Sequence, residues 1–294
     1  MQQRRIGNWE VGAVGLGEMP MSIEGRPSEE QAVQTIHAAL DAGMTLVDTA
    51  DAYCLGPQDV GHGEALVAKA LASWGGDRSS VLVATKGGHL RPGNGSWTVN
   101  GDPSYLRRAA EASLYRLGVE AIGLYQFHRP DPKVPYEDSI GVFKELLDEG
   151  KVLMVGVSNT NVHQIDLARS VLGEGNLAAV QNQFSPSFRS SEAELEYCGD
   201  LGIAFLPWSP LGGIGNQEAL RRGHPAFARV ASDHGASVPQ VVLAWMLAKG
   251  DHVIPIPGAS RASSARGSAA AADLKLSEDE VTLLNADERR SPGR

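Results

Sequence analysis

The feature that most constrains the fold is a regular alternation of short apolar runs with amphipathic segments along the whole chain. The apolar runs are too short for helices and are bounded by Gly, Pro, Asn or Asp, which is typical of buried strands. The amphipathic segments carry apolar residues at helical spacing, and several end at a glycine. Strands are expected at 11–17, 44–48, 81–86, 122–128, 152–157, 178–181, 203–208 and 253–256.

Helices are expected between these strands. Ser28 with Gln31, and Ser277 with Glu280, have the spacing of a capping box at the start of the first and last helices. The expected helices are 28–43, 63–74, 102–118, 136–149, 161–172, 190–199, 224–234, 238–249, 261–271 and one from 277 onward.

Strands that alternate with helices pair in parallel, and eight such units close into an α/β fold of the (β/α)8 type, the TIM barrel. An open doubly wound sheet is the alternative for the same alternation. No linker, charge run or low-complexity segment divides the chain, so residues 1–294 are expected to form a single domain. In a barrel the active site lies at the carboxyl ends of the strands.

Composition limits the classes of partner. The formal net charge of −9 argues against nucleic acid. No hydrophobic signal core and no run of about eighteen apolar residues occurs, so we expect no membrane association and a cytoplasmic location. Cys54 and Cys198 lie far apart without CxxC spacing, so neither a disulfide nor a zinc site is predicted. The oligomeric state is left open.

Four ionisable side chains stand where the early runs end. Asp48 ends the run at 44–48 and Tyr53 lies in the loop after it, while Lys86 and His128 end the next two runs. A phenol is a weak acid at neutral pH because its usual pKa is about 10. A cation beside the phenol lowers that pKa, and a carboxylate next to the cation holds the cation in position. The pattern predicts Tyr53 as a general acid supported by Lys86 and Asp48. His128 would orient a carbonyl oxygen.

Each of these residues has an ordinary structural alternative. Asp48 could cap a helix, Lys86 could be a solvated strand end, and His128 could be a hydrogen-bonded loop residue. Their occurrence at successive strand ends favours a shared site.

The later runs are followed by residues that suit a carboxamide and an aromatic ring. Ser158, Asn159 and Gln181 offer a hydroxyl and two amides, which match the donors and acceptors of a neutral carboxamide. Helix capping is the alternative for Ser158 or Asn159. Trp208 offers a flat face for a heteroaromatic ring, and a core position is its alternative.

The last two runs are followed by residues that suit phosphate groups. The stretch 209–213 offers a hydroxyl and unobstructed backbone amides for a pyrophosphate. Gly258, Ser260 and Arg261 precede a helix and would make an anion site, unless Arg261 is simply solvated.

These motifs together resemble those of the aldo-keto reductases. The matching stretches are Asp-Thr-Ala-Asp-Ala-Tyr at 48–53, Ala-Thr-Lys-Gly-Gly at 84–88, Phe-His-Arg-Pro-Asp-Pro at 127–132 and Ser-Pro-Leu-Gly at 209–212. The resemblance runs from Gly15 to the helix near residue 271 and is closest to the bacterial branch with Pro-Gly-x-Ser in the last loop. It implies NADP(H) as the cofactor and a catalytic tetrad of Asp48, Tyr53, Lys86 and His128.

The resemblance also implies roles around the cofactor. The Ser-Asn pair and the glutamine hold the nicotinamide carboxamide, the aromatic residue stacks on the nicotinamide, and the last loop takes the 2′-phosphate. The implied cofactor-binding residues are Gly17, Met19, Ser158, Asn159, Gln181, Trp208, Ser209, Pro210, Leu211, Gly212, Gly258, Ser260, Arg261 and Ser264. Many relatives carry a Glu-Asn pair that contacts the adenine, but here those positions are Gly267 and Ser268. The adenine contacts are therefore not predicted.

The expected activity is NADP(H)-dependent reduction of an aldehyde or ketone to an alcohol, with a small carbonyl compound as substrate and no metal. Two other classes remain open. A nucleotide-bound regulatory or sensor subunit, like the potassium-channel β subunits that resemble this family, would keep the tetrad with little turnover. A metal-dependent barrel hydrolase would use Asp48, His89 and His128, although the chain lacks a His-x-His pair.

Two long connections are candidates for substrate contacts. Segment 87–101 follows Lys86 and segment 211–223 follows the seventh run, and loops of this length commonly bind a ligand or form a lid. The substrate itself is not predicted. Candidate pocket residues are Met21, Trp97, Arg129 and Phe184.

Overall fold

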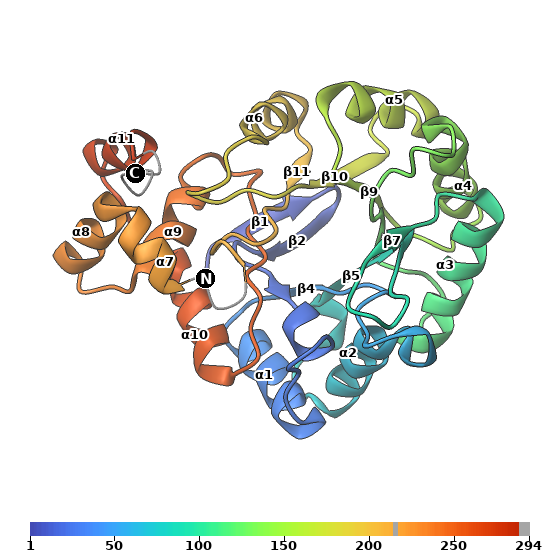
Figure 1. The fold of residues 1–294 in the computed structure, drawn as a ribbon, viewed down its shortest axis with the longest axis horizontal. Helices are drawn as coiled ribbons and strands as arrows, with labels where there is room; N and C mark the ends of the chain where they lie inside the picture. Colours follow the sequence, from blue (N-terminus) through green and yellow to red (C-terminus); the bar gives the residue numbers. More distant parts are fainter. Residues whose placement is uncertain (214–216, 288–294) are drawn as a thin grey trace.

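A computed structural model describes residues 1–213 and 217–287, and it shows a (β/α)8 barrel, as expected (Figure 1). Seven parallel strands form one curved sheet in the order β11-β10-β9-β8-β5-β4-β3. The strands are β1 Gln3–Ile6, β2 Trp9–Gly12, β3 Leu16–Gly17, β4 Leu46–Asp48, β5 Leu82–Gly87, β6 His89–Leu90, β7 Thr98–Val99, β8 Leu124–Phe127, β9 Val155–Ser158, β10 Leu177–Gln181 and β11 Ala204–Phe205.

The barrel is closed by segment 252–258, which contains the eighth expected strand. On one side this segment pairs in parallel with β11. On the other side the carbonyls of Pro255 and Pro257 accept hydrogen bonds from Gly15 and Gly17, at 2.9 and 3.0 Å. A proline has no N–H to return such a bond, so the expected strand is present only as isolated pairings.

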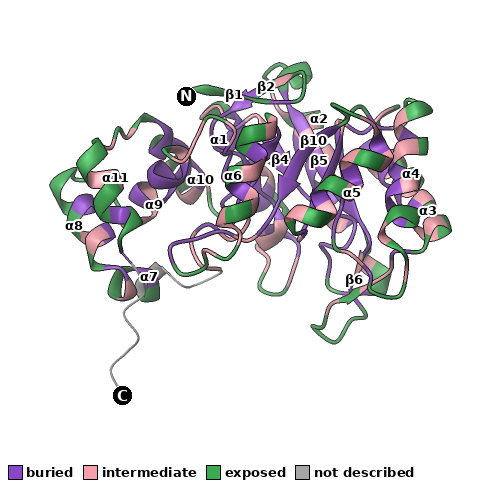
Figure 2. Cartoon of the chain, turned by 90° about the horizontal axis from the view of Figure 1, so that it is seen from above, coloured by how far each residue is buried: buried purple, intermediate pink, exposed green. Residues whose placement is uncertain are grey.

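The first expected strand, 11–17, is wrong in extent. Its first part belongs to β2, which forms an antiparallel hairpin with β1, and only β3 joins the barrel. The hairpin covers one end of the barrel, as Figure 2 shows. It adds Ile6 and Val11 to the apolar cluster inside the barrel, beside Leu46 and Leu124. The apolar run was therefore recognised correctly as a strand, but its partner could not be predicted.

The helices surround the sheet, and a group made of α7, α8, α9 and α11 lies on one side (Figure 1). The helices expected from the sequence are present within a few residues of their expected bounds, and α7 was not expected as a helix. The bounds are α1 Glu29–Asp41, α2 His62–Ser73, α3 Pro103–Leu117, α4 Tyr136–Asp148, α5 Val162–Leu172, α6 Glu192–Leu201, α7 Gln217–Gly223, α8 Pro225–Asp233, α9 Val238–Leu247, α10 Ala262–Ala270 and α11 Glu278–Asn285.

Of the two predicted capping boxes, one is confirmed and the other forms only one of its two hydrogen bonds. Ser277 and Glu280 form the complete box at the start of α11. Ser28 accepts a hydrogen bond from the backbone of Gln31, but the Gln31 side chain donates to the carbonyl of Ser260 at 2.7 Å instead of completing the box. That bond ties the start of α1 to the last loop of the barrel.

The long connection 87–101 forms a small antiparallel hairpin of β6 and β7. This hairpin projects from the end of the barrel opposite β1 and β2 (Figure 2). The connection 211–223 ends in α7, and residues 214–216 within it lie outside the described part of the chain. In the part that the structure describes, no helix is long and apolar enough to cross a bilayer. Cys54 and Cys198 are free and buried.

Candidate active site

The predicted tetrad meets at one end of the barrel, around the ammonium group of Lys86. This group donates to Asp48 Oδ2 at 2.6 Å, to the backbone carbonyl of Thr49 at 2.8 Å and to the Tyr53 hydroxyl at 3.1 Å. A lysine ammonium has three N–H donors, so all of them are used. Because the phenol oxygen of Tyr53 accepts from Lys86, its own proton is left to point elsewhere. The His128 ring meets the Tyr53 ring edge-on, with centroids 5.8 Å apart.

Two buried amides hold Asp48 from behind. Gln181 Nε2 donates to Asp48 Oδ1 at 2.8 Å, and Gln126 Nε2 donates to the same oxygen at 3.2 Å. The carboxylate therefore faces a cation on one oxygen and two neutral donors on the other. Sequence reasoning missed Gln126, although a polar residue inside the apolar run Leu-Tyr-Gln-Phe was a usable signal.

Burial decides the protonation state of the phenol. It raises the pKa of Tyr53 above its usual value, and this effect outweighs the lowering by Lys86. The direction expected from the sequence was wrong, because a sequence pattern carries no measure of desolvation. Burial acts to lower the pKa of Lys86, but Asp48 and Tyr53 more than offset it, and the net shift is upward. Tyr53 is thus held as a neutral phenol beside a charged lysine.

His128 is neutral and presents its Nε2 proton. Burial, and then the charges of Lys86, His89 and Arg129, hold its pKa well below the usual value. Its Nδ1 is buried and has no hydrogen-bond partner among the described residues. A proton on that atom would be an unsatisfied buried donor, so the favoured tautomer carries the proton on Nε2.

The β6–β7 hairpin brings two aromatic side chains to the tetrad. Trp97 meets the Tyr53 ring edge-on with centroids 6.4 Å apart, and stacks on His89 at 4.9 Å. His89 in turn contacts His128, at 4.6 Å between ring centroids. Burial, followed by nearby arginine and lysine charges, lowers the pKa of His89 to about 4, so it is neutral as well.

The substrate-pocket candidates divide into two groups. Trp97 is half-buried and Arg129 is exposed, where it donates to Asn159 Oδ1 at 3.0 Å. The prediction that Met21 and Phe184 line the substrate pocket was wrong, because both side chains are buried in apolar clusters. Phe184 stacks on Trp245 at 5.5 Å and belongs to the core between barrel and helices.

The residues expected to hold a carboxamide are brought together, but they already bond to one another. Ser158 Oγ donates to the carbonyl of Gln181 at 2.7 Å and accepts from Asn159 Nδ2 at 2.9 Å. Asn159 also donates to the carbonyl of His128 at 3.0 Å, and its φ of 59° is a left-handed conformation that few non-glycine residues adopt. Such strain is typical of a functional site.

The expected ring-stacking and pyrophosphate residues lie at the end of β11. Trp208 is half-buried, and its indole Nε1 is buried without a partner among the described residues. Ser209 has a φ of 49°, again left-handed. Pro210 is buried and Leu211 is half-buried. The expectation of unobstructed amides was wrong for Gly212, whose N–H donates to the carbonyl of Ser209 at 2.9 Å.

The last loop presents one basic side chain without an acidic partner. Arg261 is exposed at the N-cap of α10 and forms no ion pair with any residue that the structure describes. Ser260 and Ser264 are half-buried beside it, and Gly258 is exposed. A Cβ atom on Gly267 would meet nothing within 4 Å, so a side chain at this position would have open space.

Gly17 and Met19 lie where β3 leaves the barrel. A Cβ on Gly17 would come within 2.8 Å of the carbonyl of Ile256, so barrel closure alone requires a glycine there. Met19 is half-buried at the start of a short 3₁₀ turn, Met19–Met21.

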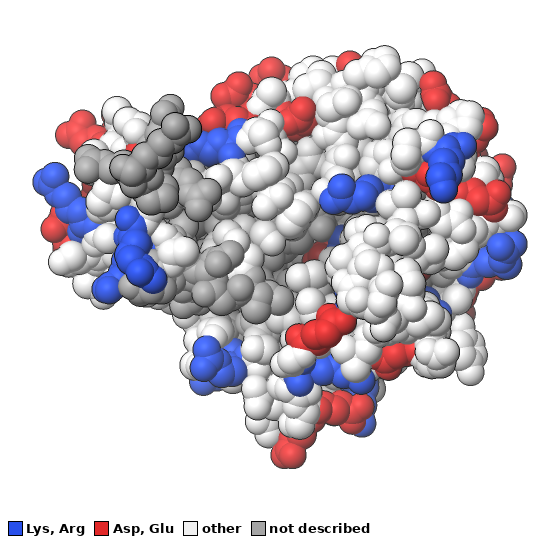
Figure 3. All heavy atoms as spheres, viewed as in Figure 1, with Lys and Arg blue, Asp and Glu red and all other residues white. Residues whose placement is uncertain are grey.

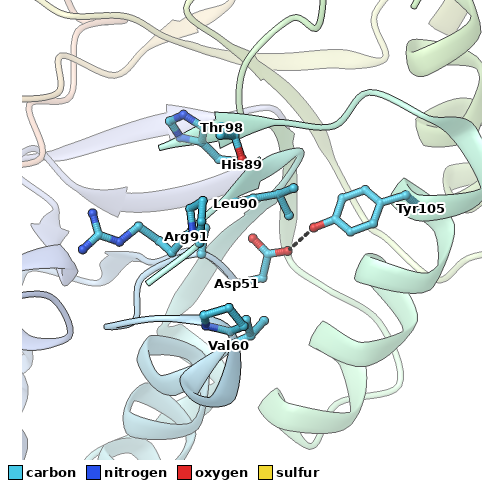
Figure 4. A pocket seen from close by; sticks show the side chains of 10 residues that line it. Asp51, Val60, His89, Leu90, Arg91, Thr98 and Tyr105 are labelled. Carbon is cyan, nitrogen blue, oxygen red and sulfur yellow. Dashed lines mark hydrogen bonds between the residues drawn. The ribbon is translucent and has the colours of Figure 1, made fainter. Parts of the chain in front are cut away.

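A cavity of about 290 Å³ lies between the loop after β4 and the β6–β7 hairpin (Figure 4). Asp51 points into it, with one carboxylate oxygen 3.5 Å from the Tyr105 hydroxyl and the other without a partner among the described residues. Burial, and then the neighbouring Glu64, raise the pKa of Asp51 to about 8. The carboxyl group is therefore mostly protonated at neutral pH. Sequence reasoning did not identify this feature.

The described residues contain no group of three or more His, Cys, Asp or Glu side chains arranged to hold a metal ion. Asp48, which a metal-dependent hydrolase would need as a ligand, is already bonded to Lys86 and two glutamines.

The face on the β6–β7 side of the barrel is hollowed and largely uncharged near its centre, with acidic and basic side chains mostly toward its edges (Figure 3).

Known proteins resemble this chain in sequence and in fold. The model of the Aldo/keto reductase family matches residues 13–287. An uncharacterized oxidoreductase of Schizosaccharomyces pombe is 33% identical over 285 residues, covering 96% of this chain and 88% of that protein. A thermostable aldo-keto reductase solved with the inhibitor epalrestat superposes with a TM-score of 0.82 at 29% identity, covering 97% of this chain and 99% of that one.

An aldo/keto reductase from Klebsiella pneumoniae, solved with NADP and acetate, superposes with a TM-score of 0.78 at 27% identity, covering 96% of this chain and 94% of that one. The family match spans nearly the whole barrel. The chain belongs to the aldo/keto reductase family.

Proposed function

We propose that this protein is an NADP(H)-dependent reductase of small aldehydes or ketones in which Tyr53 is the general acid. The observation that carries the proposal is the 3.1 Å bond from Lys86 to the Tyr53 hydroxyl. It fixes the phenol as an acceptor toward the lysine, so the remaining phenolic proton is available to a carbonyl oxygen at the mouth of the barrel.

The other tetrad residues support that proton transfer. Neutral His128 offers its Nε2 proton to the same carbonyl oxygen and orients it, while Lys86 stabilises negative charge that develops on Tyr53. Asp48 and its two glutamine partners keep the lysine charged and in place. When bound, a reduced nicotinamide supplies a hydride to the carbonyl carbon. Tyr53 donates the proton that completes the alcohol and then regains one from solvent.

Several features suit a nicotinamide dinucleotide with a 2′-phosphate. Trp208 offers a half-exposed ring, and Ser158, Asn159 and Gln181 lie together at the adjacent strand ends. Arg261 has no acidic partner among the described residues and stands where the backbone N–H groups of α10 begin, which suits a dianion. The Klebsiella pneumoniae relative was solved with NADP, which supports the same choice.

The test is Tyr53→Phe, measured as steady NADPH oxidation with a generic aldehyde. We expect kcat to fall by about 10²–10⁴-fold, the usual contribution of a general acid, with NADPH binding retained. Tyr136→Phe is the control for removing a buried tyrosine hydroxyl, because the Tyr136 hydroxyl lies outside the tetrad and has no partner among the described residues. Near-normal turnover in Tyr53→Phe would remove Tyr53 from the mechanism. Binding of NADPH without turnover in the unaltered protein would favour a regulatory subunit instead.

A further inference from the structure

A fully buried glutamate lies directly behind the tetrad and has no role in the mechanism above. The backbone N–H of Glu18 donates to the carbonyl of Asp48 at 2.9 Å, so the two residues are held together. Its Oε2 accepts from Thr49 Oγ1 at 2.9 Å, and its Oε1 accepts from Ser22 Oγ. Few buried carboxylates exist without a cation in direct contact, so this one calls for an explanation.

Thr49 connects Glu18 to the catalytic lysine. The hydroxyl of Thr49 donates to Glu18, and its carbonyl accepts from Lys86 at 2.8 Å. One residue therefore contacts both groups, and a charge on Glu18 is felt at Lys86 and Tyr53 through the low-dielectric interior. The charged and titratable groups near Glu18 are Lys86 on β5, Asp48 on β4, His62 on α2, which connects through Ser22, and, more distantly, Tyr53 in the loop after β4.

Ser22 connects Glu18 to the protein surface. Ser22 Oγ lies 2.8 Å from His62 Nδ1, and His62 is half-buried at the start of α2. Gly63 closes the space around the carboxylate, because a Cβ there would lie 2.4 Å from Glu18 Oε2. Glu18 is thus sealed from direct solvent contact but has a hydrogen-bonded route for exchanging a proton.

We propose that Glu18 is a positioning residue for the tetrad, and that its ionisation, with the proton exchanged through Ser22 and His62, keeps Tyr53 protonated as the general acid. This inference rests on the proposed function of Tyr53. Burial, opposed by the hydrogen bonds from Ser22 and Thr49 and by the charge of Lys86, raises the pKa of Glu18 to about 7. Glu18 therefore becomes charged as the pH passes through neutrality.

The sign of the effect follows from the charges. A negative Glu18 acts to raise the pKa of Tyr53. A reductase needs the protonated phenol, so the charged glutamate extends activity to higher pH. Below pH 7 the glutamate is mostly protonated and neutral, and it then resembles a glutamine in both shape and charge.

The test is the pH profile of kcat for aldehyde reduction in Glu18→Gln. We expect rates within about twofold of the unaltered enzyme near pH 6, and a high-pH limb displaced to lower pH by about half a unit to one unit. Glu64→Gln is the matched control, since Glu64 is equally buried and accepts two side-chain hydrogen bonds but is not one of the leading causes of the shift in the Tyr53 pKa. A superimposable profile, or an equal loss of rate at every pH, would overturn the proposal.

A second measurement does not depend on activity. The pKa of Glu18 is raised on folding from about 4.5 to about 7, so Glu18 contributes a loss of stability as pH rises through this window, and Glu18→Gln lacks that contribution. The difference between their urea midpoints should therefore grow across the window and then level off. Lys86→Met should extend the upper end of the window to higher pH, because Lys86 lowers the folded-state pKa of Glu18.

These readouts separate two failures. Absence of turnover with any carbonyl compound would refute the proposed function, while the stability window would still report the coupling between Glu18 and Lys86. If Lys86→Met does not change the pH range of the Glu18 stability effect, the proposed coupling between Glu18 and Lys86 is refuted, even if the enzyme is an active reductase. If Glu18→Gln does not fold, Ser22→Ala tests the coupling through the stability window instead, since loss of the Ser22 hydrogen bond should raise the pKa of Glu18. The upper end of the window should then lie at higher pH, and an unchanged window would overturn the proposal.

Discussion

Replacing Lys86 by methionine should separate the structural contribution of the buried ion pair from its contribution to catalysis. The Lys86 side chain is fully buried and Asp48 is 3% exposed, with 2.6 Å between Nζ and Oδ2. Removing one partner leaves an unpaired buried charge, which costs about 3–5 kcal/mol of unfolding free energy. Lys86→Met should lose this amount in urea unfolding at pH 7, followed by both fluorescence and circular dichroism to verify a single transition.

Neutral pH is suitable for this measurement because of the direction of the lysine shift. The pKa of Lys86 is raised in the folded protein, so its contribution is present below the usual 10.5 and is lost only as pH rises through the higher folded-state value. The full effect is therefore expressed at pH 7.

The double variant Asp48→Asn/Lys86→Met is the control. It removes both charges and leaves the Thr49 carbonyl without its lysine donor, which should cost about 1–3 kcal/mol, less than either single variant. The coupling energy between the two sites should then be about 3 kcal/mol or more. Turnover should fall by about 10²–10⁴-fold in Lys86→Met and in the double variant, because both lack the cation beside Tyr53. A loss below about 1 kcal/mol in Lys86→Met, typical of an exposed pair, would refute the reasoning.

Two further predictions concern ligand contacts. Trp97→Ala should raise KM for bulky aromatic aldehydes more than for small ones, because Trp97 lies on the β6–β7 hairpin beside Tyr53, and equal effects on both substrates would mark it as a packing residue. Arg261→Ala should weaken NADPH binding by about ten- to a hundredfold and leave NADH nearly unchanged, as a charge-assisted bond to the 2′-phosphate requires. Fluorescence titration measures both cofactors, and equal weakening of the two would remove the main support for NADP.

The barrel could be predicted because strand and helix patterns are local, but its two ends could not. Val11 reads as the start of a barrel strand, yet its partner is the strand β1, joined through Gly7 at a φ of 53°. The eighth strand lacks donors at Pro255 and Pro257, so it closes the barrel without a regular ladder. Both details depend on which segments meet in space, and hydrophobic periodicity does not report that.

The tetrad could be predicted for a related reason. Each of its residues ends a strand or lies just beyond one, and parallel strands bring their carboxyl ends to one edge. The sequence did not predict that the amides of Gln126 and Gln181 donate hydrogen bonds to Asp48. Gln181 was expected to hold a carboxamide, but its Nε2 donates to Asp48, a residue far away in the sequence. The pKa of Tyr53 was expected to fall, and burial raises it.

The arrangement around Lys86 explains how a charged layer persists above an apolar barrel interior. Leu46, Leu82 and Leu124 fill the cluster below, where no solvent can stabilise an ammonium group. All three donors of Lys86 are used, so the side chain cannot turn to another partner without losing a buried hydrogen bond. The Tyr53 hydroxyl is the one of these three acceptors that also carries a proton. The layer of buried charges therefore leaves the Tyr53 proton uncommitted among these three acceptors, as the proposed reduction requires.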